Sequence, residues 1–249
     1  MNDWIVPDWP APLNVNALFT TRNGGVSGGK SDVYATLNLG SHVNDDLSNV
    51  EKNRAILSQH LPSTPKWLEQ VHGTTIHCLD DETTSLQGDA ALSRTAGTVC
   101  AVMVADCLPV FLCDRAGTMV ATVHAGWRGL AAGIIEKTVA EMGQDQAEIM
   151  AWLGPAIGPK CFEVGEEVRD VFVNHDNQSS AAFVPQQGDN SDKWLSDIFQ
   201  LARLRLAEAG VTEVFGGGVC TYSDPSRFFS YRRDGETGRM AALIWLSEP

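Results

Sequence analysis

The fold is decided by two apolar runs that follow each other closely, Val99-Cys100-Ala101-Val102-Met103-Val104 and Val110-Phe111-Leu112-Cys113. A third run, residues 119–124, comes soon after them. Apolar residues fill nearly every position of these runs, whereas a strand with one wet face would alternate apolar and polar residues. We therefore expect neighbouring strands that are covered on both faces.

The segments on either side of these runs mix helix and strand patterns. The predicted helices span residues 44–61, 130–142, 164–173 and 194–209, and the further strands span 66–71, 74–79, 149–153 and 240–246. Two polar segments, 174–180 and 186–191, are expected to be surface loops. Because no internal repeat or long linker divides the chain, we predict one α/β (α+β) domain that covers residues 1–249.

Composition excludes several classes of protein. The chain has 249 residues, of which 43% are hydrophobic, so it can form a sizeable core rather than a disordered or fibrous chain. The 31 acidic and 18 basic residues give a net charge of −13, which argues against nucleic acid and anionic membranes as partners. No basic region followed by an apolar stretch stands at the N-terminus, so we expect a cytoplasmic protein with reduced cysteines.

Three short segments place a metal ligand or nucleophile where a strand is expected to end. They are Gln70-Val71-His72-Gly73, Ala105-Asp106-Cys107-Leu108-Pro109 and Val123-His124-Ala125-Gly126-Trp127-Arg128-Gly129. Two imidazoles and one thiolate form the kind of three-ligand set that catalytic zinc sites use. The alternative is structural: His72 caps a turn, Cys107 is a small buried hydrophobe, and His124 is a hydrogen-bonded core histidine.

The neighbours of these residues have plainer expectations. His42, His60, His77 and His175 are assigned to the surface or the core. Asp106 precedes Cys107 and is expected to be structural or to orient a ligand from a neighbouring strand.

Arginine and glycine gather in segments that could hold an anion. Residues 21–29 and 230–239 are rich in turn residues. The first segment contains Arg22, the second contains Arg232, Arg233 and Arg239, and a fifth arginine, Arg128, lies in the glycine-containing segment after His124. Fixed guanidinium charges and backbone N–H groups suit a phosphate. The first segment matches neither a Walker loop nor a dinucleotide fingerprint. The alternatives are a mobile glycine loop for the first segment and, for Asp234-Gly235, a hairpin turn.

Taken together, the motifs resemble the YfiH-type polyphenol-oxidase (laccase-domain) family, whose members are now described as purine nucleoside phosphorylases. The resemblance runs nearly end to end. Besides the segments quoted above, it rests on Phe19-Thr20-Thr21-Arg22-Asn23-Gly24-Gly25-Val26-Ser27, Leu37-Asn38-Leu39-Gly40, Gly88-Asp89-Ala90, Gly154-Pro155-Ala156-Ile157-Gly158 and Ser230-Tyr231-Arg232-Arg233-Asp234.

The resemblance implies a fold and a site. The fold would be a layered α/β/β/α arrangement with a mixed β-sheet sandwich, as in the cytotoxic-necrotizing-factor-like proteins. The family's zinc ligands fall on His72, Cys107 and His124, which would also be the catalytic residues. Arg22 and Asn38 match positions expected to line the pocket, and Arg128, Arg232 and Arg233 are our further candidates for binding substrate or phosphate.

The resemblance also implies an activity. Members cleave adenosine, inosine and 5′-methylthioadenosine with phosphate, releasing base and ribose 1-phosphate, and they deaminate adenosine to inosine. The usual nucleobase-deaminase signature is absent here, so the general acid/base stays open among Glu69, Asp106 and a liganded cysteine. The expected partners are therefore a purine nucleoside and phosphate.

Other classes of protein remain as alternatives. Two histidines and one cysteine also resemble a blue-copper set, so a laccase-type copper oxidase is one. A cysteine hydrolase or amidase in peptidoglycan-precursor editing, with Cys107 as nucleophile and His124 as base, is another. A non-catalytic zinc module is disfavoured because three protein ligands leave an open coordination position.

Overall fold

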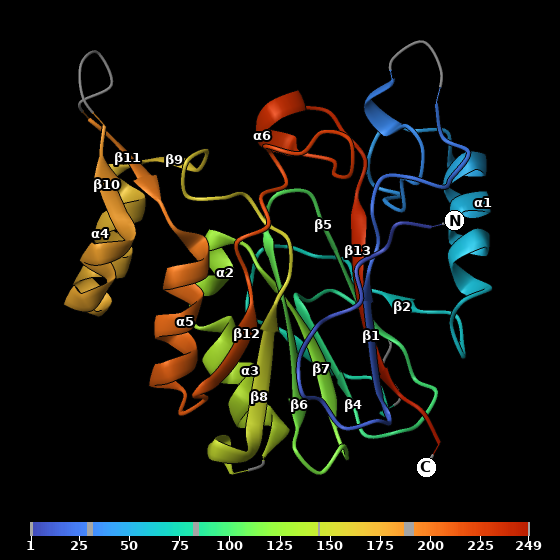
Figure 1. Cartoon of the computed structure of the whole chain (residues 1–249), viewed down its shortest axis with the longest axis horizontal. Coiled ribbons are helices and arrows are strands. Elements are labelled where there is room, and N and C mark those ends of the chain that lie inside the picture. The colour runs from blue at the N-terminus through green and yellow to red at the C-terminus, as the bar shows by residue number, and fades with distance from the viewer. Residues whose placement is uncertain (1, 29–31, 82–84, 144, 187–191, 249) are drawn as a thin grey trace.

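Two β-sheets packed face to face form the centre of the computed structural model, which describes residues 2–28, 32–81, 85–143, 145–186 and 192–248 (Figure 1). The six-stranded sheet has the order β12-β8-β6-β7-β4-β3, and the four-stranded sheet has the order β1-β13-β5-β2. The six-stranded sheet consists of β3 (Ile76–Cys78), β4 (Ala90–Ser93), β6 (Leu108–Asp114), β7 (Val120–Ala125), β8 (Ile149–Leu153) and β12 (Glu213–Gly216). The four-stranded sheet consists of β1 (Val15–Phe19), β2 (Lys66–Trp67), β5 (Cys100–Val104) and β13 (Met240–Leu246).

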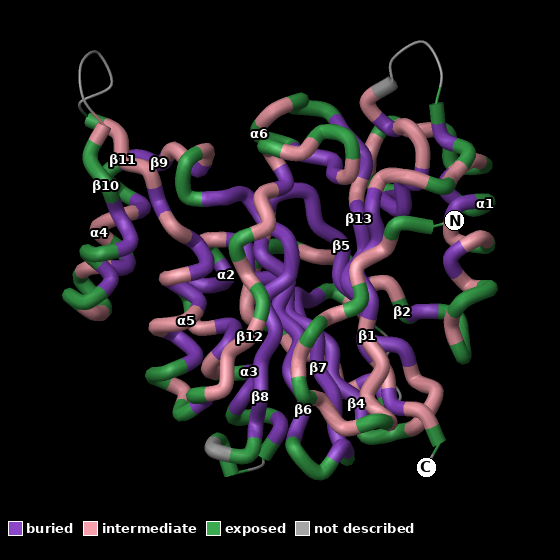
Figure 2. Tube along the Cα trace, viewed as in Figure 1, coloured by how far each residue is buried: buried purple, intermediate pink, exposed green. Residues whose placement is uncertain are grey.

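The central strands are buried on both faces, as their unbroken apolar runs predict (Figure 2). Along β6, Val110 and Leu112 face the helices, whereas Phe111 and Cys113 face the other sheet. On the same inner face, the Phe111 ring stacks on Trp152 of β8 with centroids 5.5 Å apart. Neither face of this sheet is left to solvent, so no polar alternation is needed.

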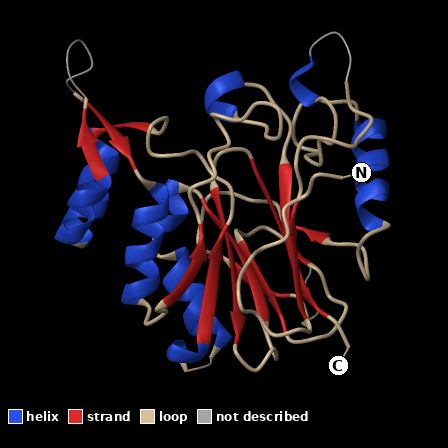
Figure 3. Cartoon of the chain, in the orientation of Figure 1, coloured by secondary structure: helices blue, strands red, loops and turns tan. Residues whose placement is uncertain are grey.

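Helices cover the outer face of each sheet (Figure 3). On the six-stranded sheet lie α2 (Trp127–Ala131), α3 (Ile134–Met142) and α5 (Ile198–Glu208), and on the four-stranded sheet lies α1 (Leu47–Ser58), whose Leu57 packs with Ala241 and Leu243. The layers follow the order α/β/β/α, which confirms the predicted fold class. Within the described ranges, no helix is long and apolar enough to cross a membrane.

A small third sheet interrupts two of the predicted helices. It contains β9 (Glu163–Gly165), β10 (Phe183–Pro185) and β11 (Lys193–Ser196). The helix predicted at 194–209 therefore begins only at Ile198, where the Asp197 carboxylate accepts hydrogen bonds from the amides of Phe199 and Gln200. Likewise, α4 (Glu166–His175) follows β9 and extends beyond its predicted end.

Several local predictions need correction. The loop predicted at 174–180 contains most of a 3₁₀ helix, Asn177–Ala182, while 187–191 of the other predicted loop lie outside the described residues. The segment at Asp234 is no hairpin: α6 (Tyr231–Asp234) ends there, and Gly235 takes the positive φ of 70° that glycine favours at a helix end. The strands expected at 66–71 and 74–79 shrink to β2 and β3 because the residues between them form the loop that carries His72.

Candidate active site

Three chain segments bring His72, Cys107 and His124 together at one end of the six-stranded sheet. Cys107 directly precedes β6, and His124 lies near the end of β7, its antiparallel neighbour, where it pairs with Pro109. His72 comes from the loop between β2 and β3. Their ligand atoms all lie within 4.8 Å of one another, and the Cys107 Sγ is 3.7 Å from the His72 Nε2. The segments that carry Cys107 and His124 are distant in sequence from His72, so only the fold brings the three ligands together.

The spacing of these atoms fits a tetrahedral metal ion. With metal–sulfur and metal–nitrogen bonds of about 2.3 and 2.0 Å, tetrahedral ligand atoms stand roughly 3.5 Å apart. The observed 3.7 Å is close to that separation. Two nitrogens and one sulfur suit zinc with one coordination position open for a reactant, and the same donors also occur in blue-copper sites.

Asp89 organises the site, a role that is not predicted from the sequence. Its carboxylate is fully buried and accepts hydrogen bonds from the amides of His72 (2.9 Å) and Gly73 (2.7 Å) and from the His124 Nδ1 (2.8 Å). One side chain therefore holds the His72 loop and orients the His124 ring, leaving its Nε2 for a metal. The clue in the sequence was an aspartate directly before the apolar strand β4.

The site also depends on backbone geometry around these residues. His72 has φ 59°, an uncommon value for a residue other than glycine. The Gln70 side chain pairs with both the N–H and the C=O of Met103 in β5, which anchors the same loop. A Cβ at Gly126 would lie 2.8 Å from the His72 Cδ2 and 3.1 Å from the Cys107 Sγ, so only glycine leaves room for the ligands.

Charge interactions favour a thiolate at Cys107. Burial raises the pKa of this thiol, but the charge and hydrogen bond of His124 and the hydrogen bond of His72 lower it to about 6. Burial lowers the pKa of His124, but the Cys107 charge and the Asp89 hydrogen bond raise it to about 9. Burial opposes the charge of Asp89 as well, yet the hydrogen bonds from His124 and Gly73 keep its pKa below the ordinary value.

Asp106 does not orient a metal ligand. Its φ is 90°, and its buried carboxylate accepts hydrogen bonds from the Thr221 hydroxyl (2.6 Å), the Ser230 hydroxyl (3.0 Å) and the Arg232 amide (2.7 Å). These contacts tie the turn before Cys107 to the segment after β12 and to the start of α6. Of the two roles predicted for Asp106, the geometry favours the structural one.

The ligand set opens into a cavity of about 860 Å³ that also receives positive charge. Arg54 of α1, Arg239 before β13 and His42 line it. The Arg54 guanidinium donates to the Leu39 carbonyl at 3.0 Å, and Arg239 donates to the carbonyl groups before it at 2.8 and 3.1 Å. Neither arginine forms an ion pair with a carboxylate among the residues that the structure describes.

His42 shares this part of the cavity. Burial lowers its pKa, and the charges of Arg239 and Arg54 lower it further. The sequence predicts His42 at the surface or in the core, and it offers no signal for Arg54. Both residues lie far in sequence from the metal-ligand motifs, so no local pattern indicated that they line the cavity.

The five arginine and asparagine residues predicted to bind substrate do not line the cavity. Arg22 donates to the carbonyls of Ala35 and Pro225 and lies over the Phe229 ring. Asn38 is buried, and its side-chain oxygen accepts the Arg239 amide at 2.9 Å. Asn38 therefore positions an arginine of the cavity rather than reaching it.

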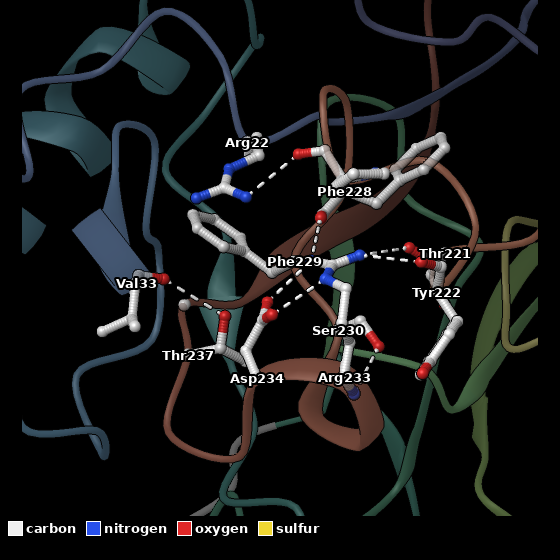
Figure 4. Close-up of polar contacts among 12 residues, drawn as sticks. Arg22, Val33, Thr221, Tyr222, Phe228, Phe229, Ser230, Arg233, Asp234 and Thr237 are labelled. Carbon is white, nitrogen blue, oxygen red and sulfur yellow. Dashed lines mark hydrogen bonds and ion pairs between the residues drawn. The ribbon is translucent and has the colours of Figure 1, made fainter. Parts of the chain in front are cut away.

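The remaining three are also engaged elsewhere. Arg128 is exposed over the Trp127 ring, and Arg232 donates to the Glu163 carbonyl. Figure 4 shows Arg233 donating to backbone carbonyls of Thr221, Tyr222 and Phe228 and to the Asp234 carboxylate. Arg233 therefore braces the backbone around α6.

Of the glycine segment predicted at 21–29, the part around Gly25 is packed against the protein, and residue 29 lies outside the described residues. The Gly25 amide donates to the Thr36 hydroxyl, and the Val26 amide donates to the Asn53 side chain of α1. A Cβ at Gly25 would lie 2.3 Å from the Thr36 carbonyl oxygen. These donors are used inside the protein, so the segment does not form the phosphate cradle considered from sequence.

A second cluster of potential ligands already contains a cation. Glu136, His175 and Glu208 lie close enough to share a metal ion. The buried Arg205 guanidinium contacts all three, with its Nη1 2.8 Å from Glu136 and 3.2 Å from Glu208. This cluster is therefore an ion-pair network that joins α3, α4 and α5.

The chain belongs to the family described as multi-copper polyphenol oxidoreductase laccase, whose model matches residues 16–247. Among its relatives, the purine nucleoside phosphorylase YfiH of Escherichia coli (strain K12) is 54% identical over 249 residues, covering 99% of this chain and 100% of the relative. The purine nucleoside phosphorylase PA4543 of Pseudomonas aeruginosa is 52% identical over 248 residues, covering 100% of each. These matches confirm the resemblance to the YfiH-type family.

Solved structures support the fold. The crystal structure of Neisseria meningitidis protein NMB0706 matches with a TM-score of 0.91 and 48% identity, covering 99% of this chain and 100% of that one. The structure of YlmD from Geobacillus stearothermophilus matches with a TM-score of 0.86 and 32% identity, covering 98% and 96%.

Proposed function

We propose that this protein is a zinc-dependent purine nucleoside phosphorylase that acts on adenosine, inosine and 5′-methylthioadenosine, with adenosine deamination as a second activity. The observation that carries the proposal is one cavity with two chemically distinct parts. One part holds the ligand set His72, Cys107 and His124, and the other holds Arg54 and Arg239. Relatives named purine nucleoside phosphorylase, more than half of whose residues are identical, support the same activity.

The two arginines suit phosphate. Their guanidinium groups are held by neutral carbonyls, so their charge is available to an anion, and a partly buried setting strengthens charge-assisted hydrogen bonds. Arg54 lies over the Trp67 ring at 4.5 Å, which fixes its plane. Phosphate bound here would approach the ribose while the base lies elsewhere in the cavity.

The rest of the cavity suits a nucleoside. Trp67, Met103 and Tyr231 supply apolar and aromatic surface for a purine ring. Glu69 also lines the cavity and is the candidate to donate a proton to the departing base, since Asp106 is occupied by structural hydrogen bonds. When bound, zinc would supply Lewis-acid chemistry, including activation of water for attack at C6 of adenosine.

The test combines metal analysis with product analysis. We expect about one zinc per chain, and we expect adenosine with phosphate to yield base and ribose 1-phosphate, detected by chromatography with and without chelator. Cys107→Ala should lose zinc and turnover together, whereas Cys113→Ala, at a buried position of β6 outside the cavity, should keep both. If zinc-loaded protein forms no product from any of the three nucleosides, the proposed phosphorylase activity is refuted.

The phosphate subsite has its own test. Loss of one charge-assisted hydrogen bond removes about 1.5–3 kcal/mol, so Arg239→Gln should raise the KM for phosphate by roughly tenfold to a hundredfold. Arg94→Gln, at an exposed arginine outside the cavity, is the matched control. An unchanged KM for phosphate in Arg239→Gln would mean that phosphate binds at a place other than Arg239.

One observation favours a second candidate, a cysteine hydrolase. Cys107, His124 and Asp89 form a nucleophile, a base and a group that orients the base, with the Asp89 oxygen 2.8 Å from the His124 Nδ1. Retained zinc with lost turnover in Cys107→Ser would favour this candidate. Copper-dependent oxygen uptake with a phenol would instead favour the laccase-type copper oxidase considered from the sequence.

A further inference from the structure

Two cysteines outside the cavity lie against the same hydroxyl group. Cys161 follows β8 in a turn, and Cys220 follows β12. The Cys161 Sγ is 3.4 Å from the Ser223 Oγ, and the Ser223 hydroxyl donates to the Cys220 Sγ at 3.3 Å. The two sulfurs are thus separated by less than the sum of these distances.

Gly158 allows this close approach. Its amide donates to the Cys220 Sγ at 3.1 Å, while its carbonyl accepts the Cys161 amide at 2.9 Å and closes the turn. A Cβ at Gly158 would lie 3.0 Å from the Cys220 Cβ and 3.1 Å from its sulfur. A larger residue would push the two segments, and with them the two thiols, apart.

The surroundings of Cys220 stabilise a thiolate. Burial raises the pKa of its thiol, but hydrogen bonds from the Ser223 hydroxyl and from the amides of Gly158, Ser223 and Tyr222 outweigh that effect and lower the pKa. Cys161 and Cys220 are both partly exposed. In contrast, Cys113 is buried, and desolvation raises its pKa to about 12.

We propose that Cys220 and Cys161 form a peroxide-reactive dithiol site, in which Cys220 is the attacking thiol and Cys161 the resolving one. The Cys220 thiolate attacks one oxygen of a hydroperoxide, the O–O bond breaks, and Cys220 becomes a sulfenic acid as hydroxide or alkoxide leaves. The Cys161 thiol then attacks the Cys220 sulfur, so that a disulfide forms and water leaves. The two thiols together lose two electrons and two protons, and the peroxide accepts both.

This inference is independent of the proposed enzymatic function. The dithiol lies outside the residues that line the cavity, and its chemistry needs neither nucleoside nor phosphate. Turning of the 158–161 segment, in which Pro159 and Lys160 are exposed, is the movement that would bring the sulfurs to bonding distance.

The experiment treats the full-length, zinc-loaded protein with a small excess of hydrogen peroxide, followed by alkylation and tryptic mass spectrometry. We expect a dithiothreitol-reversible crosslink between peptides 161–169 and 206–227, with the mass of two hydrogens lost. In Cys161→Ser, dimedone should label Cys220, because the sulfenic acid is no longer resolved. In Cys220→Ser, Cys161 should stay reduced at the same peroxide dose.

Two further variants separate this chemistry from general thiol oxidation. Ser223→Ala should slow labelling of Cys220 by iodoacetamide several-fold, because the hydroxyl donor to its sulfur is lost. Cys78→Ser, at a partly exposed thiol whose pKa is raised by burial, should oxidise like the unchanged protein. The proposal is overturned if Cys220 reacts no faster than Cys78, or if oxidised Cys220 pairs with a cysteine other than Cys161.

Discussion

Replacing Asp89 by asparagine tests whether this one carboxylate assembles the metal site. Asparagine has the same shape, but its amide group can donate where the carboxylate accepted. In one orientation its NH2 group would face the Gly73 amide, and in the other it would face the His72 amide and the His124 ring. In both orientations a donor faces a donor, and hydrogen bonds are lost. Each charge-assisted hydrogen bond lost costs about 1.5–3 kcal/mol.

Part of that loss should appear as weaker metal binding. Partners that orient a metal ligand typically contribute 10–100-fold in affinity, so we expect Asp89→Asn to raise the Kd for zinc by that factor, or about 1.4–2.7 kcal/mol. Competition with a chromophoric chelator measures the Kd, and urea unfolding of the metal-free protein measures the loss of stability separately.

Asp114→Asn is the matched control. Asp114 is also buried and accepts hydrogen bonds from the Thr118 and Met119 amides at 2.8 and 2.9 Å, but it lies at the opposite end of β6 from Cys107. It should lose stability and keep its affinity for zinc. If Asp89→Asn binds zinc within twofold of the unchanged protein, or Asp114→Asn weakens it equally, Asp89 does not organise the site.

Three further predictions concern packing, stability and pH. Gly126→Ala should weaken zinc binding at least tenfold because its Cβ would crowd His72 and the Cys107 sulfur, while Gly73→Ala, whose Cβ has no contact below 3.5 Å, should bind zinc nearly normally; equal affinities in a chelator titration would count against the crowding argument. Arg205→Met should lower the free energy of unfolding by about 1–3 kcal/mol in urea because it leaves the half-buried Glu136 carboxylate without its buried partner, and an unchanged free energy of unfolding would contradict this. In metal-free protein, the rate of alkylation of Cys107, followed by peptide mass spectrometry, should rise with pH because the thiolate is the reactive form. The rate should level off above the Cys107 pKa of about 6. A midpoint at the ordinary thiol pKa of about 8.5 would mean that the imidazoles do not stabilise the thiolate.

The parts of the site that the sequence could predict are those with local signals. Cys107 and His124 stand at the ends of apolar runs, so strand pattern alone placed both at a sheet edge. The same pattern placed His72 at the end of a strand, but nothing local shows that the loop after β2 returns to these strands, so the family resemblance was needed to join the three residues into one site. Asp89 has one weak signal, its place directly before an apolar strand, whereas Arg54 has none, because it belongs to a helix with mostly polar residues.

Errors in the predicted fold have a similar origin. The strands of the third sheet have only three or four residues, too few for a period to stand out from the neighbouring helix patterns. Charge alone does not distinguish the arginines of the 230–239 segment from one another. Arg233 is engaged by carbonyls and a carboxylate, whereas Arg239 reaches the cavity, and this difference depends on how the chain turns after α6.

The sequence by itself determined the buried strands, the mixed α/β class and the identity of the metal-ligand candidates, because apolar periodicity and residue chemistry are local properties. Only the tertiary structure decided which side chains share the cavity. Packing of the two sheets brings α1, with Arg54, to the same cavity as Cys107, and the Asp89 carboxylate folds the His72 loop onto His124. Such contacts join residues far apart in the chain, and they form because buried polar groups must find partners wherever the fold places them.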